Sequence, residues 1–281
     1  METILTFWQH IPEKIDPTIL EFGAFQLRYY GLMYLAAFVT TYSLVLYRVR
    51  TEKLPYKKEE IQDYFVWAIV GLLAGARLGY VLFYQPQYFL HHPLEIILPF
   101  EWSAGAVHYT GISGMSYHGG LAGVVAASLI FCRKRKIGFW SFADLLCPAI
   151  PLGYTFGRLG NFINGELYGR ATTVPWGMYF PQDPAGVLRH PSQLYEAFFE
   201  GIVLFALLWS VRRKKAAPGY FLALYLVGYG AVRFVIEFFR EPDPQIGFLF
   251  GFFTTGQMFC VVMILAGAAL MAFRRPQRGR P

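Results

Sequence analysis

The chain has 281 residues, of which 55% are hydrophobic, 19% aromatic and only 15% charged, and its mean hydropathy is +0.37. Because soluble domains carry about 25% charged residues, this composition excludes an ordinary soluble protein and predicts an integral membrane protein. The net charge of +7 comes from short basic clusters between apolar stretches, a pattern that favours anionic lipid headgroups and argues against nucleic acid as a partner.

Residues 1–17 contain neither a basic segment nor a small-residue cleavage site, so we do not expect a cleaved signal peptide. Beyond them, seven stretches approach the roughly 20 apolar residues that a helix needs to cross a bilayer. The predicted spans are residues 28–47, 62–84, 117–132, 140–160, 194–211, 219–239 and 252–273. We therefore predict an all-α membrane protein with one catalytic domain over residues 1–281, whose outer loops, 85–116 and 161–193, lie partly in the membrane interface.

Basic residues follow every second predicted span. They are Arg48, Arg50, Lys53, Lys57 and Lys58; Arg133, Lys134, Arg135 and Lys136; Arg212, Arg213, Lys214 and Lys215; and Arg274, Arg275, Arg278 and Arg280. Since cytoplasmic loops carry the excess of Lys and Arg, we predict an N-terminus outside and a C-terminus in the cytoplasm.

The three cysteines, Cys132, Cys147 and Cys260, lie inside apolar stretches and show no pairing or metal-binding spacing. The sequence also lacks an HExxH motif. We therefore predict no disulfide, no metal site and no cofactor.

Charged residues and histidines interrupt the predicted spans, where each charge costs about 2.5–3.5 kcal/mol near the membrane centre. Those that we single out, within the spans or next to their ends, are Arg77, His118, Arg158, His190, Glu196, Arg233, Glu237 and Arg240. In the predicted topology they lie at the outer ends of their helices, except Arg77, which lies in the outer half of its span. Because such costly residues usually mark function, we predict a site toward the outer face of the membrane.

Several of these residues also have a purely structural interpretation. Arg233 and Glu237 are four residues apart and could form an ion pair on one helix face, which Arg240 would extend. His118 could be an interfacial histidine, and Arg77 could extend its side chain to the membrane surface.

Two segments with polar residues, 157–170 and 190–196, call for different interpretations. In HPSQLYE, Pro191 suits the first turn of a helix, and Ser192 or Gln193 could form a capping box with Glu196. Segment 157–170 has more amides, charges and glycines than a helix end requires, and we interpret it as a polar cage at the membrane boundary. It holds Arg158, Asn161, Asn164, Glu166 and Arg170, separated by Gly157, Gly160, Gly165 and Gly169.

Arginines at an outer face suit a phosphate group, to which they donate charge-assisted and often bidentate hydrogen bonds. A histidine offers a base near neutral pH, and carboxylates can orient arginines or accept protons. The sequence has no Gly-x-Ser-x-Gly motif, and none of its cysteines lies at an outer helix end. The residues therefore predict a site for an anionic phospholipid whose reaction partner brings the nucleophile.

Six motifs follow one another along the chain. They are YYGLMYL (29–35), RLGYVLFY (77–84), MSYHGGLAG (115–123), GRLGNFINGELYGR (157–170), RHPSQLYE (189–196) and GYGAVRFVIEFFREPD (228–243). Over nearly the whole chain this set resembles the prolipoprotein diacylglyceryl transferase family, of which GRLGNFINGE is the signature. The loop between Arg170 and Arg189 is shorter than in some members.

The resemblance implies an enzyme of the bacterial cytoplasmic (inner) membrane with its active site toward the outer face. Such an enzyme transfers the diacylglyceryl group of phosphatidylglycerol to the thiol of the lipobox cysteine of a preprolipoprotein signal peptide. A thioether forms and glycerol-1-phosphate leaves, which is the first step of lipoprotein maturation. The missing nucleophile is then the cysteine of the partner, whose ordinary pKa of about 8.5 requires a base or a positive field.

On this resemblance we expect the catalytic residues to be His118, Arg158, Arg233 and Glu237. We assign His118 as the candidate base, while Arg158 and Arg233 hold the phosphate. Glu237 orients Arg233; alternatively, an arginine-rich field activates the thiol without a histidine. The expected phosphatidylglycerol-binding residues are Arg158, Asn161, Glu166, Tyr30, Tyr229, Arg77, Arg240 and Gly169, with His190 and Glu196 as further candidates.

Two other functions remain open on the residues alone. A phospholipid hydrolase would use Ser116 or Ser192 beside His118 or His190, and would release lipid products without an acceptor peptide. A lipid or anion transporter would use the outer arginines as a basic vestibule, although nothing comparable marks the inner ends of the spans and the chain has no internal repeat.

Overall fold

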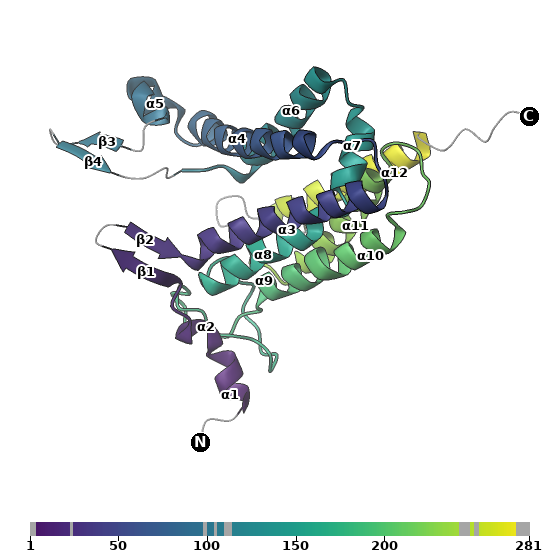
Figure 1. Ribbon diagram of the computed structural model, residues 1–281. Helices are drawn as coiled ribbons and strands as arrows, with labels where there is room; N and C mark the ends of the chain where they lie inside the picture. The colour runs from purple at the N-terminus through teal and green to yellow at the C-terminus, as the bar shows by residue number, and fades with distance from the viewer. Residues whose placement is uncertain are drawn as a thin grey trace, which may run out of the picture. The chain divides into compact units, whose positions relative to one another are not determined.

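The computed structural model describes residues 4–22, 25–97, 100–103, 106–109, 114–241, 248–249 and 253–273 (Figure 1). The chain forms two compact units, of which the first comprises Met1–Lys53 and Ala143–Pro281 and the second Leu54–Phe142. The basic residues Arg274, Arg275, Arg278 and Arg280 lie outside the described residues. The single catalytic domain over the whole chain stays a prediction.

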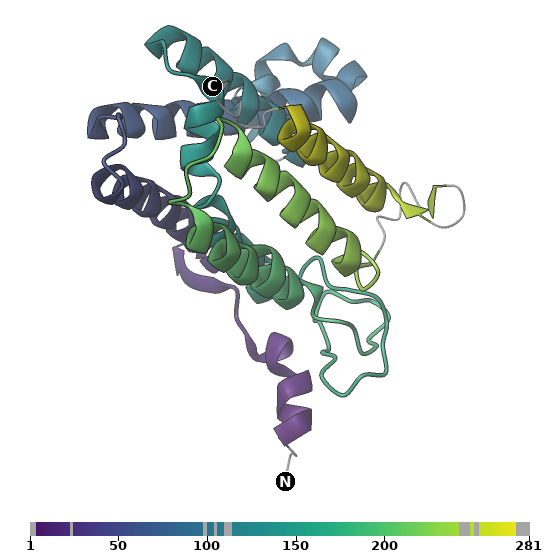
Figure 2. The same cartoon turned by 90° about the vertical axis from the view of Figure 1, so that its right-hand side faces the viewer.

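The first unit is built mainly from helices. Its elements are α1 (Ile4–Gln9), α2 (Ile11–Lys14), β1 (Thr18–Phe22), β2 (Phe25–Arg28), α3 (Tyr29–Thr51), α8 (Ile150–Ile163), α9 (Ser192–Tyr195), the π-helix η2 (Glu196–Val203), α10 (Leu204–Val211), α11 (Tyr220–Ile236), β5 (Phe248–Leu249), β6 (Phe253–Thr254) and α12 (Thr255–Phe273). Helix α3 packs against α8, and α8 packs against η2. Figure 2 shows α10, α11 and α12 side by side, with α11 between the other two.

The second unit contains α4 (Lys58–Phe83), α5 (Pro86–His91), the 3-10 helix η1 (Pro93–Ile96), β3 (Phe100–Ser103), β4 (Ala106–Tyr109) and α6 (Tyr117–Arg135). Helix α7 (Phe139–Leu146) carries the chain from the second unit into the first. The strands form antiparallel hairpins, β1 with β2, β3 with β4, and β5 with β6.

This largely helical architecture confirms the prediction of an α-helical membrane protein in its coarse form. Helices α3, α4 and α12, and the continuous helix Ser192–Val211, are each long and apolar enough to cross a membrane, and α11 is a shorter apolar helix. The total of seven spans and the orientation of the termini stay predictions.

The structure differs from the predicted span at 140–160, which is wrong as a single helix. The chain there forms α7 and α8, interrupted at residues 147–149. Pro148 and Pro151 explain the interruption, because proline lacks the N–H that a continuous helix requires. The antiparallel strand pairs are a second difference, because strands of two to five residues leave no long apolar stretch in the sequence.

A buried arginine ties several segments together at the C-terminal end of α3. Arg48 is 3% exposed and donates from Nη1 to the carbonyl oxygens of Asp144 and Leu145. Its Nη2 donates to the Glu52 carboxylate at 2.9 Å, and Arg212 Nε lies 3.3 Å from the other oxygen of Glu52. Two arginines of the predicted cytoplasmic clusters therefore also serve in packing the first unit.

Glycines set the packing of α4 against α6 in the second unit. Gly71 and Gly79 on α4 face Gly123 and Gly119 on α6. A Cβ at Gly71 would lie 2.6 Å from the Ala127 Cβ, and one at Gly79 would lie 2.7 Å from the Gly119 Cα. Since real Cβ atoms do not approach that closely, the two helices can pack this tightly only with glycine, as in other membrane helix pairs.

Replacing Gly71 by Leu should force α4 away from α6, because no side chain fits between Gly71 and Ala127. Overpacking of this kind costs about 1–3 kcal/mol, so we expect a clearly lower Tm in detergent micelles. The matched control is Gly31→Leu on α3, where an added Cβ meets no atom within 4 Å. An equal fall in Tm for the two variants would contradict the packing role.

Candidate active site

The centre of the candidate site is Glu196, whose side chain is completely buried in the first unit. Arg158 Nε lies 2.6 Å from its Oε2, while Arg233 Nη1 and Arg240 Nη1 lie 3.0 and 3.2 Å from its Oε1. The three arginine side chains are only 13%, 13% and 14% exposed. Residues that the sequence places in three separate segments therefore meet at one carboxylate.

The three arginines reach Glu196 from different elements. Arg158 lies in the second half of α8 and Arg233 in the last turn of α11. Helix α11 ends at Ile236, before the predicted end at 239, and Arg240 follows it in an antiparallel bridge with Gly169. The expectation that Arg240 continues the helix face of Arg233 is thus wrong, because a turn at residues 237–239 separates Arg240 from the helix.

Glu196 is the first residue of the π-helix η2. π-Helical turns are rare and occur frequently at functional sites. Next to η2, the Thr155 hydroxyl of α8 donates to the Ala197 carbonyl at 3.3 Å, and Gly201 lies too close to Thr155 for any Cβ to fit. This close approach of α8 to η2 places Arg158 within ion-pair distance of Glu196.

Arg233 has a second carboxylate partner in Glu237. Arg233 Nη2 lies 3.1 Å from Glu237 Oε2, so the predicted ion pair is present. The Thr254 hydroxyl of β6 donates to Glu237 Oε1 at 3.0 Å, and a Cβ at Gly256 of α12 would lie 2.8 Å from the carboxylate carbon. Glu237 is therefore fixed from two further elements and can orient Arg233 as the sequence suggested.

The segment 157–170 forms a connected polar group beside Arg158. Arg158 Nη1 donates to Asn161 Oδ1 at 3.4 Å, and Asn161 Nδ2 donates to Glu166 Oε1 at 2.7 Å. Tyr30 of α3 lies beside Asn161, and its hydroxyl is 3.1 Å from that of Tyr34. The structure thus brings together four of the predicted substrate-binding residues.

Gly169 and Arg170 lie beside the backbone of Arg240 and form hydrogen bonds that fix its position. The Gly169 N–H donates to the His190 carbonyl at 2.8 Å, and a Cβ at Gly169 would lie 2.8 Å from the His190 Cβ. The Arg170 N–H donates to the Phe239 carbonyl at 2.9 Å, and Arg170 Nε donates to the Arg240 carbonyl at 2.8 Å. The glycine is needed here because three backbone segments approach one another.

The predicted capping box at the start of the 192–211 helix is wrong. Pro191 precedes α9 without any side-chain cap hydrogen bond. Ser192 donates instead to the Leu167 carbonyl at 3.1 Å, and Gln193 donates to the Glu166 carbonyl at 2.7 Å. The helix start is therefore anchored on the 157–170 segment, which leaves the Glu196 carboxylate available for the arginines.

His190 lies at the edge of this group. Its Nδ1 is 3.1 Å from the Tyr195 hydroxyl, which also accepts a hydrogen bond from Trp176 Nε1 at 2.8 Å. Burial lowers the pKa of His190, which favours its neutral form at pH 7. Ser192 is completely buried, and its hydroxyl donates a hydrogen bond to a backbone carbonyl. This arrangement does not favour Ser192 as a nucleophile.

His118 and Arg77 belong to the second unit. His118 lies in the first turn of α6, and the Ser116 hydroxyl caps that helix. Arg77 donates from Nε to the Ile96 carbonyl at 2.9 Å and from Nη2 to the Glu95 carbonyl at 2.5 Å, so its guanidinium holds the segment after α4. The catalytic role of His118 and the lipid-binding role of Arg77 stay predictions.

Sequence interpretation missed two members of the cluster, Tyr154 and Glu200. Glu200 is completely buried, and its Oε2 accepts a hydrogen bond from the Tyr154 hydroxyl at 2.5 Å. Arg158 Nε donates to the Tyr154 hydroxyl at 2.6 Å, and the ring of Tyr229 packs edge-on against that of Tyr154 at 5.8 Å. Glu200 was detectable as a carboxylate inside a predicted span, whereas nothing in the sequence distinguishes Tyr154 from other tyrosines in apolar stretches.

The formal charges of the cluster balance. Its cations are Arg158, Arg233 and Arg240, and its carboxylates are Glu196, Glu200 and Glu237. Buried ions are stable only when they are paired, so the balance explains how so many charges persist inside the unit. A phosphate that binds these arginines adds negative charge to a neutral group.

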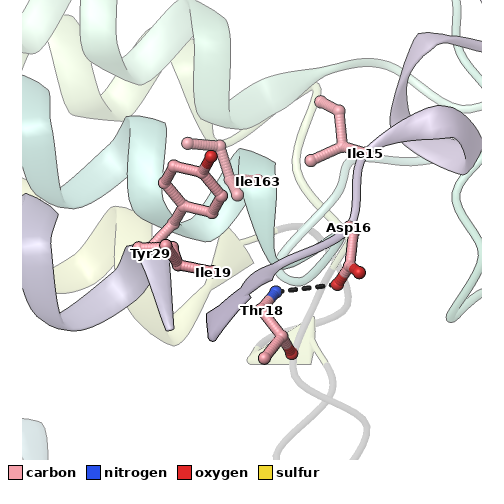
Figure 3. A pocket seen from close by; sticks show the side chains of 6 residues that line it. All are labelled: Ile15, Asp16, Thr18, Ile19, Tyr29 and Ile163. Atoms are coloured by element: carbon pink, nitrogen blue, oxygen red, sulfur yellow. Dashed lines mark hydrogen bonds between the residues drawn. The ribbon is translucent and has the colours of Figure 1, made fainter. Parts of the chain in front are cut away.

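A separate pocket lies where the N-terminal segment meets the ends of α3 and α8 (Figure 3). Its lining residues are Ile15, Asp16, Thr18, Ile19, Tyr29 and Ile163. The only charged residue among these six is Asp16, which accepts a hydrogen bond from the Thr18 N–H at 2.8 Å. An apolar lining with one carboxylate does not suit a phosphate, and the arginine cluster remains the candidate site.

Asp183 organises the loop between α8 and α9. Its two carboxylate oxygens accept hydrogen bonds from Arg189 Nε at 2.8 Å and Arg189 Nη2 at 2.9 Å, and also from the N–H groups of Ala185 and Val187. The hydrogen bonds from Arg189 hold the pKa of Asp183 below its ordinary value. The Arg189 guanidinium lies over the ring of Tyr168 at 5.3 Å, which connects the loop to the end of the polar cage.

Comparison with known proteins identifies the family. The sequence profile described as Prolipoprotein diacylglyceryl transferase matches residues 17–273. The chain belongs to the prolipoprotein diacylglyceryl transferase family. The resemblance drawn from the six motifs is confirmed, and the profile covers every described element from β1 to α12.

Relatives named phosphatidylglycerol–prolipoprotein diacylglyceryl transferase align over almost their full length. The protein of Chlorobaculum tepidum is 53% identical over 270 residues, which cover 96% of this chain and 93% of the relative. The protein of Bordetella parapertussis is 47% identical over 268 residues, covering 94% and 98% of the two chains. That of Wolinella succinogenes is 42% identical over 276 residues, covering 97% and 98%.

Replacing Glu196 by Gln should destabilise the protein strongly, because three buried arginines lose their shared counter-charge. Breaking a buried ion pair costs about 3–5 kcal/mol, so we expect a large fall in Tm in micelles. The control is Glu241→Gln, which removes a half-exposed partner of Arg189 and should cost about 1 kcal/mol or less. Similar Tm values for the two variants would contradict the central role of Glu196.

The Asp183 pair predicts a pH-dependent stability. Because the pKa of Asp183 is lower in the folded than in the unfolded chain, its carboxylate stabilises the fold above the ordinary value of about 3.9 and loses this contribution as the pH falls through the folded-state value. The unsubstituted protein should therefore melt above Asp183→Asn at pH 7, and the difference should shrink below about pH 4. Thermal unfolding of both proteins between about pH 7 and pH 3 measures the difference in Tm. A Tm difference that does not change with pH would contradict the stabilising role of the Asp183 carboxylate.

Proposed function

We propose that this chain transfers the diacylglyceryl group of phosphatidylglycerol to the thiol of the lipobox cysteine of a preprolipoprotein, the first step of bacterial lipoprotein maturation. The observation that carries the proposal is the convergence of three arginines on buried Glu196 in a chain of the prolipoprotein diacylglyceryl transferase family. The names of its relatives give the same donor and acceptor.

Arg158 and Arg233 bind the phosphodiester of the donor in this proposal. Each guanidinium is fixed by at least two partners, Arg158 by Tyr154 and Glu196, and Arg233 by Glu196 and Glu237. Donors held in place before the reaction stabilise the charge that develops on the departing phosphate without reorganisation. The carboxylates thus serve to orient the arginines.

The glycerol headgroup occupies the polar group beside Arg158. Asn161, Glu166 and Tyr30 offer an amide, a carboxylate and a phenol in one connected set, which suits the two free hydroxyls of the headgroup. We place Tyr229 in the same pocket because its ring packs against Tyr154 next to Arg158. Arg240, Gly169 and Arg77 complete the proposed lipid-binding set.

In the reaction, the sulfur of the acceptor cysteine attacks the glyceryl carbon that carries the phosphate. A C–S bond forms, the C–O bond breaks, and its electron pair leaves with glycerol-1-phosphate. The thiol proton passes to a base, for which His118 is the candidate, or is lost because the positive field of the arginines stabilises the thiolate. The chain itself forms no covalent intermediate.

We place the site toward the outer face of the bacterial inner membrane, in a protein with seven spans, an outer N-terminus and a cytoplasmic C-terminus. The polar group of the site contacts α3 at Tyr30, near its start, whereas the basic Arg48 and Arg212 meet near its end. This separation along one helix supports the placement, because the positive-inside rule assigns the basic end to the cytoplasm.

The test of this function uses the purified full chain with phosphatidylglycerol labelled in its non-acylated glycerol. The acceptor is a lipobox peptide, and the control is the same peptide with its cysteine replaced by serine. We expect labelled glycerol phosphate only with the cysteine peptide, together with a thioether-linked lipid on that peptide. Release without the cysteine would instead identify a hydrolase, and movement of unmodified lipid across vesicles would identify a transporter.

Substitutions in the same assay separate the roles of the residues. Arg158→Ala and Arg233→Ala should each lower kcat by at least about 100-fold, the usual cost of losing one preorganised charge donor. If His118→Gln keeps near-normal turnover, the positive field alone activates the thiol. An active Arg233→Ala enzyme would refute the phosphate-binding role.

A further inference from the structure

Glu200 is the least stabilised carboxylate of the buried cluster. Glu196 has three arginines within 3.2 Å, whereas the nearest arginine atom to Glu200, Arg233 Nη1, lies 3.5 Å from its Oε1. In the described part of the chain Glu200 Oε1 accepts no hydrogen bond, and Oε2 accepts one, from the Tyr154 hydroxyl. Both carboxylates are completely buried, so the difference lies in their partners alone.

The groups that face Glu200 come from its own helix and from three neighbouring helices. From α8 they are Tyr154 and Arg158, from α11 Arg233, from its own helix Glu196, and from α12 Cys260. Complete burial and the like charge of Glu196 disfavour an ionised Glu200, and Arg233 Nη1 at 3.5 Å opposes them. A new negative charge next to the arginines would therefore act most strongly on this weakly held carboxylate.

The charge balance of the site favours the uptake of one proton when a phosphodiester binds. Three arginines and three carboxylates are formally neutral, and a phosphodiester brings one negative charge into a region shielded from water. An uncompensated charge is costly in such surroundings, and one proton removes it. Protonation of Glu200 would also weaken its attraction for Arg233 Nη1, which then has one ionised carboxylate, Glu196, to share with the phosphate.

We propose that Glu200 takes up one proton when the phosphodiester of phosphatidylglycerol binds at Arg158 and Arg233, and releases it when the anion leaves. The proton comes from water and binds to the Glu200 carboxylate, which becomes a neutral carboxylic acid beside Tyr154. Glu200 is thus a positioning residue that couples lipid binding to pH, and this inference rests on the proposed function for the identity of its ligand.

The test measures phosphatidylglycerol binding to the full chain in micelles of a neutral detergent, by titration calorimetry in buffers that differ in ionisation heat. We expect close to one proton taken up per lipid bound in the pH range where Kd rises, and there Kd should rise toward tenfold per pH unit. Glu200→Gln mimics the neutral acid, so it should bind the lipid with a Kd that hardly changes with pH and with no proton uptake.

The matched control is Glu241→Gln, which removes a half-exposed partner of Arg189 outside the cluster and leaves its three arginines and three carboxylates unchanged. This variant should keep the proton uptake even if its affinity changes. Infrared spectra of the unsubstituted protein give a second measurement that needs no variant, since lipid binding should produce the carbonyl band of a protonated carboxylic acid.

Two outcomes overturn the proposal. One is lipid binding to the unsubstituted protein without proton uptake or a new carboxylic acid band, and the other is equal proton uptake by Glu200→Gln. In either case diacylglyceryl transfer in the labelled-lipid assay can persist, so the proposed function would stand. Failure of transfer combined with intact proton-coupled binding would instead refute the function and leave the proton site in place.

Discussion

The architecture of the first unit depends on the ion pairs between one completely buried carboxylate and three arginines. Glu196 lies on a largely apolar helix, and it persists there because Arg158, Arg233 and Arg240 surround it. Each of these arginines would in turn be unstable in the same surroundings without a carboxylate. The ion pairs therefore require α8, η2 and the end of α11 to assemble together.

Much of the surrounding structure maintains this arrangement. Gly169 and Arg170 bind the backbone of the segment that carries Arg240, and Gly201 lets α8 approach η2. Ser192 and Gln193 anchor the start of the helix on the polar segment before it. These hydrogen bonds fix the backbone segments that carry Arg240 and Glu196, and so they set the distances within the ion pairs.

A site of this kind is organised before its substrate arrives, which suits a reaction whose nucleophile comes from another molecule. The arginines are oriented by internal carboxylates, so the chain needs only to bind an anionic group and to stabilise the charge that leaves with it. The same internal carboxylates limit how much negative charge the site accepts. Proton coupling through Glu200 follows from this limit, because each of the three arginines of the cluster already pairs with a carboxylate.

The sequence by itself determined the membrane character, the positions of most apolar helices and the family. It also singled out Arg158, Asn161, Glu166, Arg233 and Glu237, since charges and amides in apolar stretches are costly wherever they occur. The Arg233–Glu237 pair was predictable from a spacing of four residues, which depends only on local helix geometry. Hydropathy, in contrast, failed at 140–160, where prolines divide one apolar stretch into two helices.

Only the tertiary structure decided which partner each polar residue has. Glu196 looked like part of a helix cap, yet it binds three arginines that lie between 37 and 44 positions away in the chain, and Tyr154 and Glu200 joined the cluster without having been singled out. The physical reason is that the cost of burying a charge is a property of the residue, whereas its compensation depends on which other helices pack against it. The cost of burial can be inferred from the sequence, whereas the compensating partners come together only when the chain folds.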